Sequence, residues 1–410
     1  MELKPGYKLT EVGVIPEDWD VKPLKEISPQ QSVGLVINPS TYFDKGGTVP
    51  MLVGSNIGEN KIDWASAKKI TEDSNQRLPA SRLSAGDLVM VRVGDPGTTA
   101  VIPPEFDGCN CASMMIVRKH PSFDSEWLCF VMNSPLGRAR VAGVQYGTAQ
   151  KQFNISDAVD FHYPVPSLPE QRSIATTLSD MDELLGALDR LIAKKRDLKQ
   201  AAMQQLLTGK TRLPGFNGKW EVKQLGDVVE KLVGGGTPSR SNPAYWGTEI
   251  PWVTVKDFST FHPHRTQEAI TRIGLKNSAS HLIPAGTLIT STRMALGKTV
   301  IYEVNVAINQ DLKAIFLKPE VSVLFLYYWF EHNSQVIDEL GSGSTVKGIS
   351  IAALKGISFP ILALSEQRSI ATVLSDMDTE IAALEQRRDK TRALKQAMMQ
   401  ELLTGRIRLV

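Results

Sequence analysis

A stretch of 46 residues occurs twice in this chain, at 168–213 and again at 364–409. The two copies align without a gap at an offset of 196 positions, and 29 of the 46 residues are identical. This period is too long for a solenoid, whose units repeat every 20–50 residues or so, roughly a quarter of the offset at most. The repeat therefore indicates an internal duplication, in which two related halves are joined in one chain.

Both copies have the pattern of one long helix. Their apolar residues recur in alternating steps of four and three, which is typical of the seam of a coiled coil. The seam residues are Ile174, Leu178, Met181, Leu185, Leu188 and Ile192 in the first copy, and Ile370, Leu374, Met377, Ile381 and Leu384 in the second. Ser167 with Glu170 fits a capping box at the start of the first helix. Gly209 and Gly405 stand where the two helices are expected to end.

The charges are ordered along each copy, with the acids first and the bases later. The first copy has Asp180, Asp182, Glu183 and Asp189, then Arg190, Lys194, Lys195, Arg196 and Lys199; the second has Asp376, Asp378, Glu380 and Glu385, then Arg387, Arg388, Lys390, Arg392 and Lys395. An antiparallel pair sets acidic half against basic half at both ends, whereas a parallel pair opposes like charges. The alternative is two unrelated, solvated surface helices. The apolar seam and the charge order together favour antiparallel pairing.

Composition sets the broad class of the protein. At 410 residues the chain is expected to hold more than one domain, and its net charge of +2 means that any basic footprint for nucleic acid must be local. Three cysteines are too few for a disulfide framework, so we expect reduced thiols. We expect no secretory signal, because the first residues have no apolar core behind them, and the longest apolar run, Val321–Phe330, is too short for a membrane span. We therefore expect a cytoplasmic protein that does not enter the membrane.

The segments outside the repeats also match each other at their ends. We predict a first recognition domain at 1–166, a helical spacer at 167–212, a second recognition domain at 213–362 and a C-terminal helical spacer at 363–410. The shared anchors are Trp19 and Trp220, Ala85-Gly86 and Ala285-Gly286, and the turns Gly147–Lys151 and Gly343–Lys347. Short strands, turns and two helical stretches (124–141 and 321–340) predict mixed α/β (α+β) domains. Shared ends with divergent middles indicate one fold that reads two different targets.

No motif in the chain makes a convincing active site. Asn242-Pro-Ala-Tyr245 resembles the loop with which amino-methyltransferases hold a base, but no glycine-rich donor loop stands upstream, so a turn is favoured. The Gly-Lys-Thr sequences at 209–211 and 297–299 lack the glycine that a phosphate loop has five residues earlier. His262/His264 and Cys109/Cys111 are pairs without a second pair at metal spacing. We expect no catalytic residue and no metal site.

The stronger candidates are binding residues. Small residues let the backbone approach a phosphate, while Arg, Lys, Asn and Gln reach base edges. Solvated surface is the alternative for any one of them, but their recurrence at matching places in both halves favours the group. The candidate DNA-binding residues are Arg92, Gly147, Thr148, Lys151, Gln152 and Asn154 in the first half, and Gly236, Thr237, Ser239, Arg293, Lys298, Ser344, Lys347 and Ser350 in the second.

Together these features resemble the specificity subunit of a type I restriction–modification system, over essentially the whole chain. The resemblance is carried by Leu-Pro/Ser-Glu-Gln-Arg-Ser-Ile-Ala (168–175 and 364–371), by Gln/Glu-Leu-Leu-Thr-Gly (205–209 and 401–405), by the glycine turns before each helix, and by Gly234–Ser239 with Tyr245-Trp246 and Ile250-Pro-Trp252.

The resemblance implies two similar target-recognition domains, joined and spaced by two long antiparallel coiled-coil helices with pseudo-two-fold symmetry. Each domain would read one half of a split, asymmetric site in double-stranded DNA. The helices would set the gap and dock two modification (methyltransferase) subunits and, through them, the restriction (translocase and nuclease) subunits. It implies no cofactor on this chain, with S-adenosylmethionine, ATP and Mg²⁺ on the partner subunits.

Three alternatives remain open from the sequence. The chain could serve a modification-only system without a restriction partner, act as a coiled-coil scaffold without a role in nucleic-acid binding, or be a methyltransferase built around Asn242–Tyr245.

Overall fold

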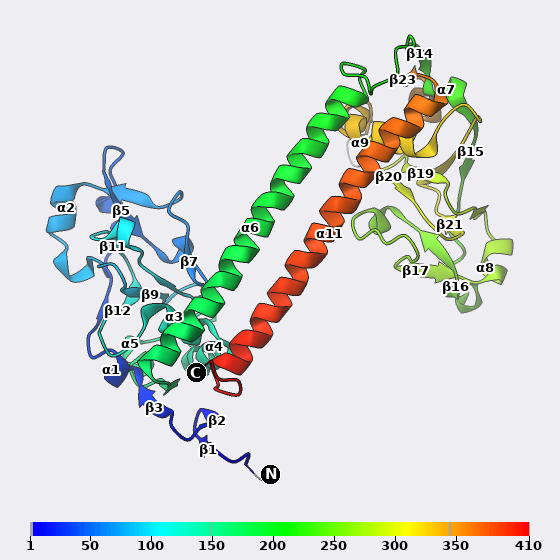
Figure 1. Cartoon of the computed structure of the whole chain (residues 1–410). Helices are drawn as coiled ribbons and strands as arrows, with labels where there is room; N and C mark the ends of the chain where they lie inside the picture. The colour runs from blue at the N-terminus through cyan, green and yellow to red at the C-terminus, as the bar shows by residue number, and fades with distance from the viewer. Residues whose placement is uncertain (1–2, 149, 344–345, 410) are drawn as a thin grey trace. The chain divides into compact units, whose positions relative to one another are not determined.

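The computed structural model describes residues 3–148, 150–343 and 346–409 (Figure 1). The chain divides into two compact units. Unit 1 comprises Met1–Asp189 with Gln386–Val410, and unit 2 comprises Arg190–Glu385. Within the described ranges, no helix carries an apolar stretch long enough to span a bilayer.

The two repeats form the two longest described helices, α6 (Leu168–Leu206) and α11 (Leu364–Leu402), each of 39 residues. At ~1.5 Å per residue each is about 58 Å long. Gly209 and Gly405 follow the helix ends with φ of +71° and +69°, which only glycine adopts without strain, so the prediction for the helix ends is confirmed. Unit 1 holds the first half of α6 and the end of α11, and unit 2 holds the complementary halves.

The start of α6 corrects one detail of the sequence analysis. The backbone N–H of Glu170 reaches Ser167 Oγ at 3.5 Å, as a capping serine would allow. The Glu170 carboxylate does not turn back to the helix terminus, because it binds Trp19 and Arg408 instead. The capping-box role predicted for Glu170 is therefore wrong.

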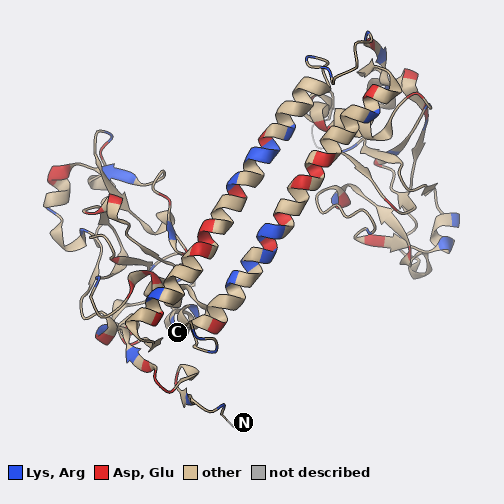
Figure 2. Cartoon of the chain, viewed as in Figure 1, with Lys and Arg blue, Asp and Glu red and all other residues tan. Residues whose placement is uncertain are grey.

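Within each unit the two half-helices run antiparallel, as their charge order predicts. In unit 1, Lys395 lies 2.5 Å from Asp182, and Arg388 lies 3.6 Å from Asp189. In unit 2 the pairs are Lys199–Asp378 (2.8 Å), Lys195–Glu380 (2.6 Å) and Arg196–Glu385 (2.5 Å). Residue numbers rise along α6 as they fall along α11, and Figure 2 shows the acidic and basic halves of both helices. The prediction of antiparallel pairing is confirmed.

The recognition domain of unit 1 is built on a four-stranded antiparallel sheet of order β10-β9-β12-β4 and a three-stranded sheet of order β11-β5-β8. Pairs β1-β2, β13-β3 and β6-β7 complete it. Its strands are β1 (Tyr7–Thr10), β2 (Gly13–Pro16), β3 (Asp20–Pro23), β4 (Gln31–Val33), β5 (Val49–Leu52), β6 (Ile57–Gly58), β7 (Lys61–Ile62), β8 (Lys68–Ile70), β9 (Leu88–Val91), β10 (Thr99–Val101), β11 (Asn110–Cys111), β12 (Met114–Val117) and β13 (His162–Val165). Its helices are α1 (Leu24–Ile27), α2 (Glu72–Gln76), α3 (Ser125–Asn133), α4 (Pro135–Val144) and α5 (Ile155–Ala158).

Unit 2 repeats this plan. Its sheets have the orders β15-β22-β19-β20 and β17-β16-β21-β18, with the pair β14-β23 beside them. Its strands are β14 (Glu221–Gln224), β15 (Val229–Gly234), β16 (Trp246–Val253), β17 (Glu268–Ile270), β18 (Leu282–Ile283), β19 (Leu288–Ser291), β20 (Thr299–Ile301), β21 (Val306–Ile308), β22 (Leu312–Leu317) and β23 (Ser358–Ile361). Its helices, besides the long pair, are α7 (Leu225–Val228), α8 (Arg272–Lys276), α9 (Val323–Glu339) and α10 (Ile351–Lys355). Each unit has a parallel strand pair, β5-β11 or β16-β21, whereas the other pairs between its described strands are antiparallel.

The core of each unit includes the ends of both long helices. In unit 1, Ile174 and Leu178 of α6 and Leu402 of α11 are buried with Trp127 and Phe130 of α3. In unit 2, the corresponding set is Ile370 and Leu374 of α11 and Leu206 of α6, with Phe325 and Phe330 of α9. Burying a side chain of this size contributes about 1.5–3 kcal/mol, so each recognition domain is fixed to the helices by its own core.

Candidate nucleic-acid interface

A cluster of tryptophan, glutamate and arginine fixes the entry of each recognition domain onto its helix. In unit 1 the Trp19 indole N–H donates to Glu170 over 3.0 Å, and Arg408 binds both oxygens of Glu170 at 2.5 and 2.8 Å. Arg408 also binds Asp18, with both N–O distances at 2.9 Å. These hydrogen bonds raise the pKa of Arg408 above its ordinary value, and the bond to Glu170 has the largest effect.

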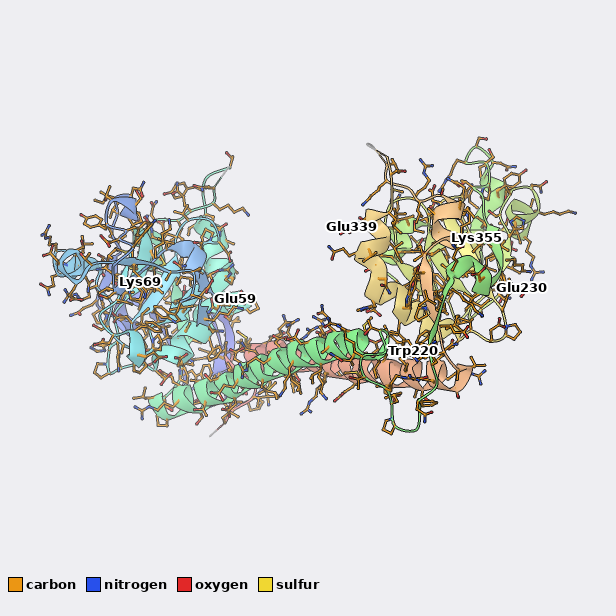
Figure 3. The ribbon with its side chains drawn as sticks, turned by 90° about the horizontal axis from the view of Figure 1, so that it is seen from above. Glu59, Lys69, Trp220, Glu230, Glu339 and Lys355 are labelled. Carbon is orange, nitrogen blue, oxygen red and sulfur yellow. The ribbon has the colours of Figure 1, made fainter. Side chains whose placement is uncertain are left out.

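Unit 2 contains the same cluster, built from equivalent residues. Trp220, labelled in Figure 3, donates to Glu366 over 3.3 Å, and Arg212 binds Glu366 at 2.5 and 2.6 Å. In each unit the glutamate opens one long helix and the arginine follows the end of the other. The role of these two arginines is not among the predictions from the sequence, although their recurrence at the offset of 196 is a usable signal.

In each repeat the glutamine that follows this glutamate binds the N-terminus of a helix of the recognition domain. Gln171 Oε1 accepts the backbone N–H of Asp124, the N-cap of α3, over 2.8 Å. Gln367 accepts the N–H of Ser322, the N-cap of α9, over 2.9 Å. Both glutamines are buried. The Glu-Gln pair of each repeat therefore positions a recognition domain rather than contacting a ligand.

The predicted site residues of unit 1 come together around the turn at 146–152. Tyr146 and Gln152 exchange two backbone hydrogen bonds of 2.9 and 3.0 Å, and the N–H of Gly94 donates to the Lys151 carbonyl over 3.1 Å. Gly147 has φ of +96° and a Cβ there would meet the Gln150 carbonyl at 2.3 Å, so this turn requires glycine.

The side chains at this turn differ in their exposure. Thr148, Lys151 and Asn154 are exposed, and Gln152 is half-buried. Asn154 Oδ1 accepts from the Tyr146 hydroxyl over 2.9 Å. Arg92, half-buried at the end of β9, has a buried Nε without a hydrogen-bond partner among the described residues. Arg92 and Lys151 therefore both supply hydrogen-bond donors at this turn.

Unit 2 forms the matching turn at 342–348. Ser342 and Gly348 exchange backbone bonds of 2.9 and 2.8 Å, and Met294 N–H donates to the Lys347 carbonyl over 2.8 Å. Gly343 has φ of +119°, and a Cβ there would meet the Val346 carbonyl at 2.5 Å. Ser344 lies outside the described residues.

Several of the predicted DNA-binding residues of unit 2 bind other residues of the same unit. The Lys347 ammonium lies 2.6 Å from Asp338, and Arg293 lies 3.5 Å from Asp311. The Ser350 hydroxyl caps α10 by accepting the Ala353 N–H over 3.1 Å. Lys298 is exposed on the turn before β20. The structure therefore brings Arg293 and Lys347 together but gives Ser350 a role in the fold.

The loop at 234–239 belongs to a separate part of unit 2. Gly236 is buried, and its carbonyl accepts the Trp252 indole N–H over 3.0 Å and the Ser280 hydroxyl over 2.6 Å. Thr237 is exposed and donates to Gln310 over 2.7 Å. The Ser239 hydroxyl lies 2.8 Å from that of Ser241. Gly236 is therefore packed against its neighbours, whereas Thr237 and Ser239 face solvent.

The motifs that resemble parts of active sites have structural roles instead. Asn242 Oδ1 accepts the Ala244 N–H over 3.1 Å and begins a short 3-10 helix, so this stretch is a turn. Gly297 has φ of +75° in a turn, and a Cβ there would meet the Ser334 carbonyl at 2.5 Å. The thiols of Cys109 and Cys111 are buried. Among the described residues no group of three or more His, Cys, Asp and Glu side chains is placed to hold a metal ion.

Comparison with known proteins agrees with this architecture. The model of the "Type I restriction modification DNA specificity domain" family matches residues 217–392. The MjaX type I specificity subunit of Methanocaldococcus jannaschii is 26% identical over 98% of this chain and 97% of its own length. Residues 217–392 therefore match a type I restriction–modification DNA specificity domain, and the resemblance of the chain to type I specificity subunits is confirmed.

Solved structures support the fold. The type I system S subunit of M. genitalium aligns with a TM-score of 0.61 at 15% identity, covering 98% of this chain and 99% of its own. A chain from a structure titled for complex assembly and conformational transition of the type I R–M system aligns with a TM-score of 0.60 at 22% identity, over 96% and 99%. The predicted fold class, two similar mixed α/β domains with a long helix pair, is confirmed.

Proposed function

We propose that this chain selects the DNA sequence on which a type I restriction–modification complex acts. Each unit carries one recognition domain, and each domain reads one half of a split, asymmetric site in double-stranded DNA. The observation that carries this proposal is the repeated Trp-Glu-Arg cluster, because it holds two domains of one plan but different surface residues in equivalent positions. Domains with different surfaces select different half-sites.

The long helices are proposed to set the gap between the half-sites. Each helix contributes to both units, so its length is the natural determinant of the spacing. Lengthening α6 and α11 by about one turn, roughly 5.4 Å, should widen the gap and leave both half-sites unchanged. A changed half-site in this variant would contradict the spacing role.

Partner subunits are proposed to dock on the helices. Leu184, Leu191 and Leu198 of α6 are exposed at seven-residue intervals, and this spacing places them on one face of the helix. Exposed apolar residues in such a row are typical of a protein interface. Replacing Leu191 and Leu198 together with glutamine should reduce co-purification with the modification subunit, whereas Ala193→Gln, also exposed, should not.

The chemistry is assigned to these partners. We propose that this chain is non-catalytic and carries no cofactor, that two modification subunits bind S-adenosylmethionine and methylate adenine, and that restriction subunits use ATP and Mg²⁺. A modification-only system would use this chain in the same way, without the restriction subunits. Co-purification from the native host distinguishes the two systems.

The direct test is a genome-wide map of methylated adenine. Cells would express this chain with its neighbouring modification subunit, and the control cells would lack this chain only. Methylation at one split motif would establish the function and define both half-sites and the gap. If a co-purifying modification subunit produces no chain-dependent methylation, the proposal is wrong and a scaffold role is favoured.

A further inference from the structure

A cation lies over an aromatic ring at the same place in both recognition domains. In unit 1 the Lys68 ammonium is 4.8 Å from the centroid of the Phe43 ring. In unit 2 the guanidinium carbon of Arg240 is 3.8 Å from the centroid of the Trp246 ring. The strand register shows the correspondence, because Phe43 pairs with Ile70 and Trp246 pairs with Ile270. Both aromatic residues follow a 3-10 helix that is capped by an asparagine side chain.

The two domains supply this cation from different elements. Lys68 lies on β8 opposite Met51, and the residue at that position of unit 2 is Glu268, opposite Trp252. Glu268 is an acid, so the cation of unit 2 comes from Arg240, in the loop between β15 and β16. The Glu268 carboxylate binds this arginine, with a distance of 2.9 Å between Arg240 Nη2 and Glu268 Oε2. Two unrelated side chains that reach one place in a fold indicate that a positive charge is required there.

Both cations are presented to solvent. Lys68 is exposed, and the Arg240 side chain is 56% exposed. The bond from Arg240 lowers the pKa of Glu268, so this pair stays ionised at neutral pH. The carboxylate engages two of the five guanidinium N–H groups, which leaves three for a ligand. The ring and the carboxylate restrict the guanidinium before binding, which reduces the entropy lost when it makes a contact.

The chemistry of these groups selects one base. Lysine and arginine carry donors only, so their best partner is an edge with adjacent acceptors. In the major groove guanine offers N7 and O6 together, whereas adenine pairs an acceptor with a donor and cytosine offers a donor. We infer that Lys68 and Arg240 each read a guanine, one in each half-site. This inference rests on the proposed function and names the specificity-determining residue of each domain.

The test compares methylation motifs of full-length variants expressed with the modification subunit. Lys68→Ala should relax one G·C position in one half-site, and Arg240→Ala should relax one in the other, with the remaining positions unchanged. The matched controls are Lys69→Ala, the next residue on β8 (labelled in Figure 3), and Arg272→Ala on α8. Successive strand residues face opposite sides, so Lys69→Ala removes the same charge without touching the aromatic site and should leave the motif intact.

Purified complexes provide the quantitative readout. Against a duplex with the guanine changed to adenine, wild-type discrimination should fall about 5- to 150-fold in the alanine variants, the range for one base contact. An unchanged motif overturns the inference, even if binding to every sequence weakens, because uniform loss is the mark of a phosphate contact.

A second variant covers the case in which an alanine variant does not fold. Arg240→Gln keeps a long polar side chain and should shift the position from guanine toward adenine, which glutamine reads through N6 and N7. Retained guanine in this variant overturns the inference. A wild-type map without any split motif would instead refute the proposed function itself, so the two failures are distinguishable.

Discussion

The indole N–H of Trp19 donates to the Glu170 carboxylate over 3.0 Å, joining residues that lie 151 positions apart. Glu170 is fully buried, and its carboxylate binds the guanidinium of Arg408 from the segment after α11. A buried charge without such partners costs several kcal/mol. Unit 1 is therefore closed by a cluster that joins the first residues of its recognition domain to the flanks of both long helices.

The first prediction concerns this cluster. Glu170→Gln leaves the Arg408 guanidinium facing a neutral amide, and we expect the free energy of unfolding of unit 1 to fall by roughly 2–4 kcal/mol. Hydrogen exchange measured by mass spectrometry should show lost protection in unit 1 and none in unit 2. Glu366→Gln should give the reverse pattern. Asp18→Asn is the control, because this second partner of Arg408 is 65% exposed and its loss should cost less than about 1 kcal/mol.

The second prediction concerns the ion pair between Lys395 of α11 and Asp182 of α6. Lys395 is 13% exposed and lies within 2.5–2.6 Å of both Asp182 oxygens. A double-mutant cycle with Lys395→Met and Asp182→Asn should give a coupling energy of about 1–2 kcal/mol in thermal or urea unfolding. The exposed pair Lys25–Asp160 serves as the control and should give less than about 1 kcal/mol. Equal coupling in both cycles would contradict the importance of burial.

Much of the fold could be predicted from the repeat. Periodicity and charge order specify the helices and their antiparallel direction, because both depend on local spacing. The role of Glu170 could not be predicted in this way, because its capping-box position is local while its partner Arg408 is distant. The charge-assisted tertiary contact with the half-buried Arg408 outweighs the local bond to the helix terminus.

The candidate site was only partly predictable. The turns at Gly147 and Gly343 repeat in the sequence, and the structure joins them to Arg92 and Arg293 through neighbouring backbone bonds. Lys68 and Arg240 occupy different positions in the sequence, so no repeat reveals that they lie over equivalent rings. Their correspondence depends on strand register, which is set by the three-dimensional pairing.

The third prediction tests the glycine turns. Gly147→Ala places a Cβ 2.3 Å from the Gln150 carbonyl at a φ of +96°, so the turn must rearrange. We expect DNA binding by the assembled complex to weaken, with a loss of about 1–3 kcal/mol in local stability. Gly143→Ala, in α4 with open space around it, is the control and should stabilise the chain by about 0.5–1 kcal/mol. Unchanged DNA affinity in Gly147→Ala would exclude this turn from the interface.

The fourth prediction concerns the three thiols. Burial raises the pKa of Cys109 to about 12 and also raises the pKa values of Cys111 and Cys129. The thiolate is the reactive form, so at pH 8 the folded chain should react with a thiol reagent far more slowly than an exposed cysteine with a pKa of about 8.5. All three should react at once in concentrated urea. The rate for the folded chain should follow unfolding, and it should rise in Glu170→Gln because all three thiols belong to unit 1. Rapid reaction of a native thiol at pH 8 would contradict the burial of that cysteine.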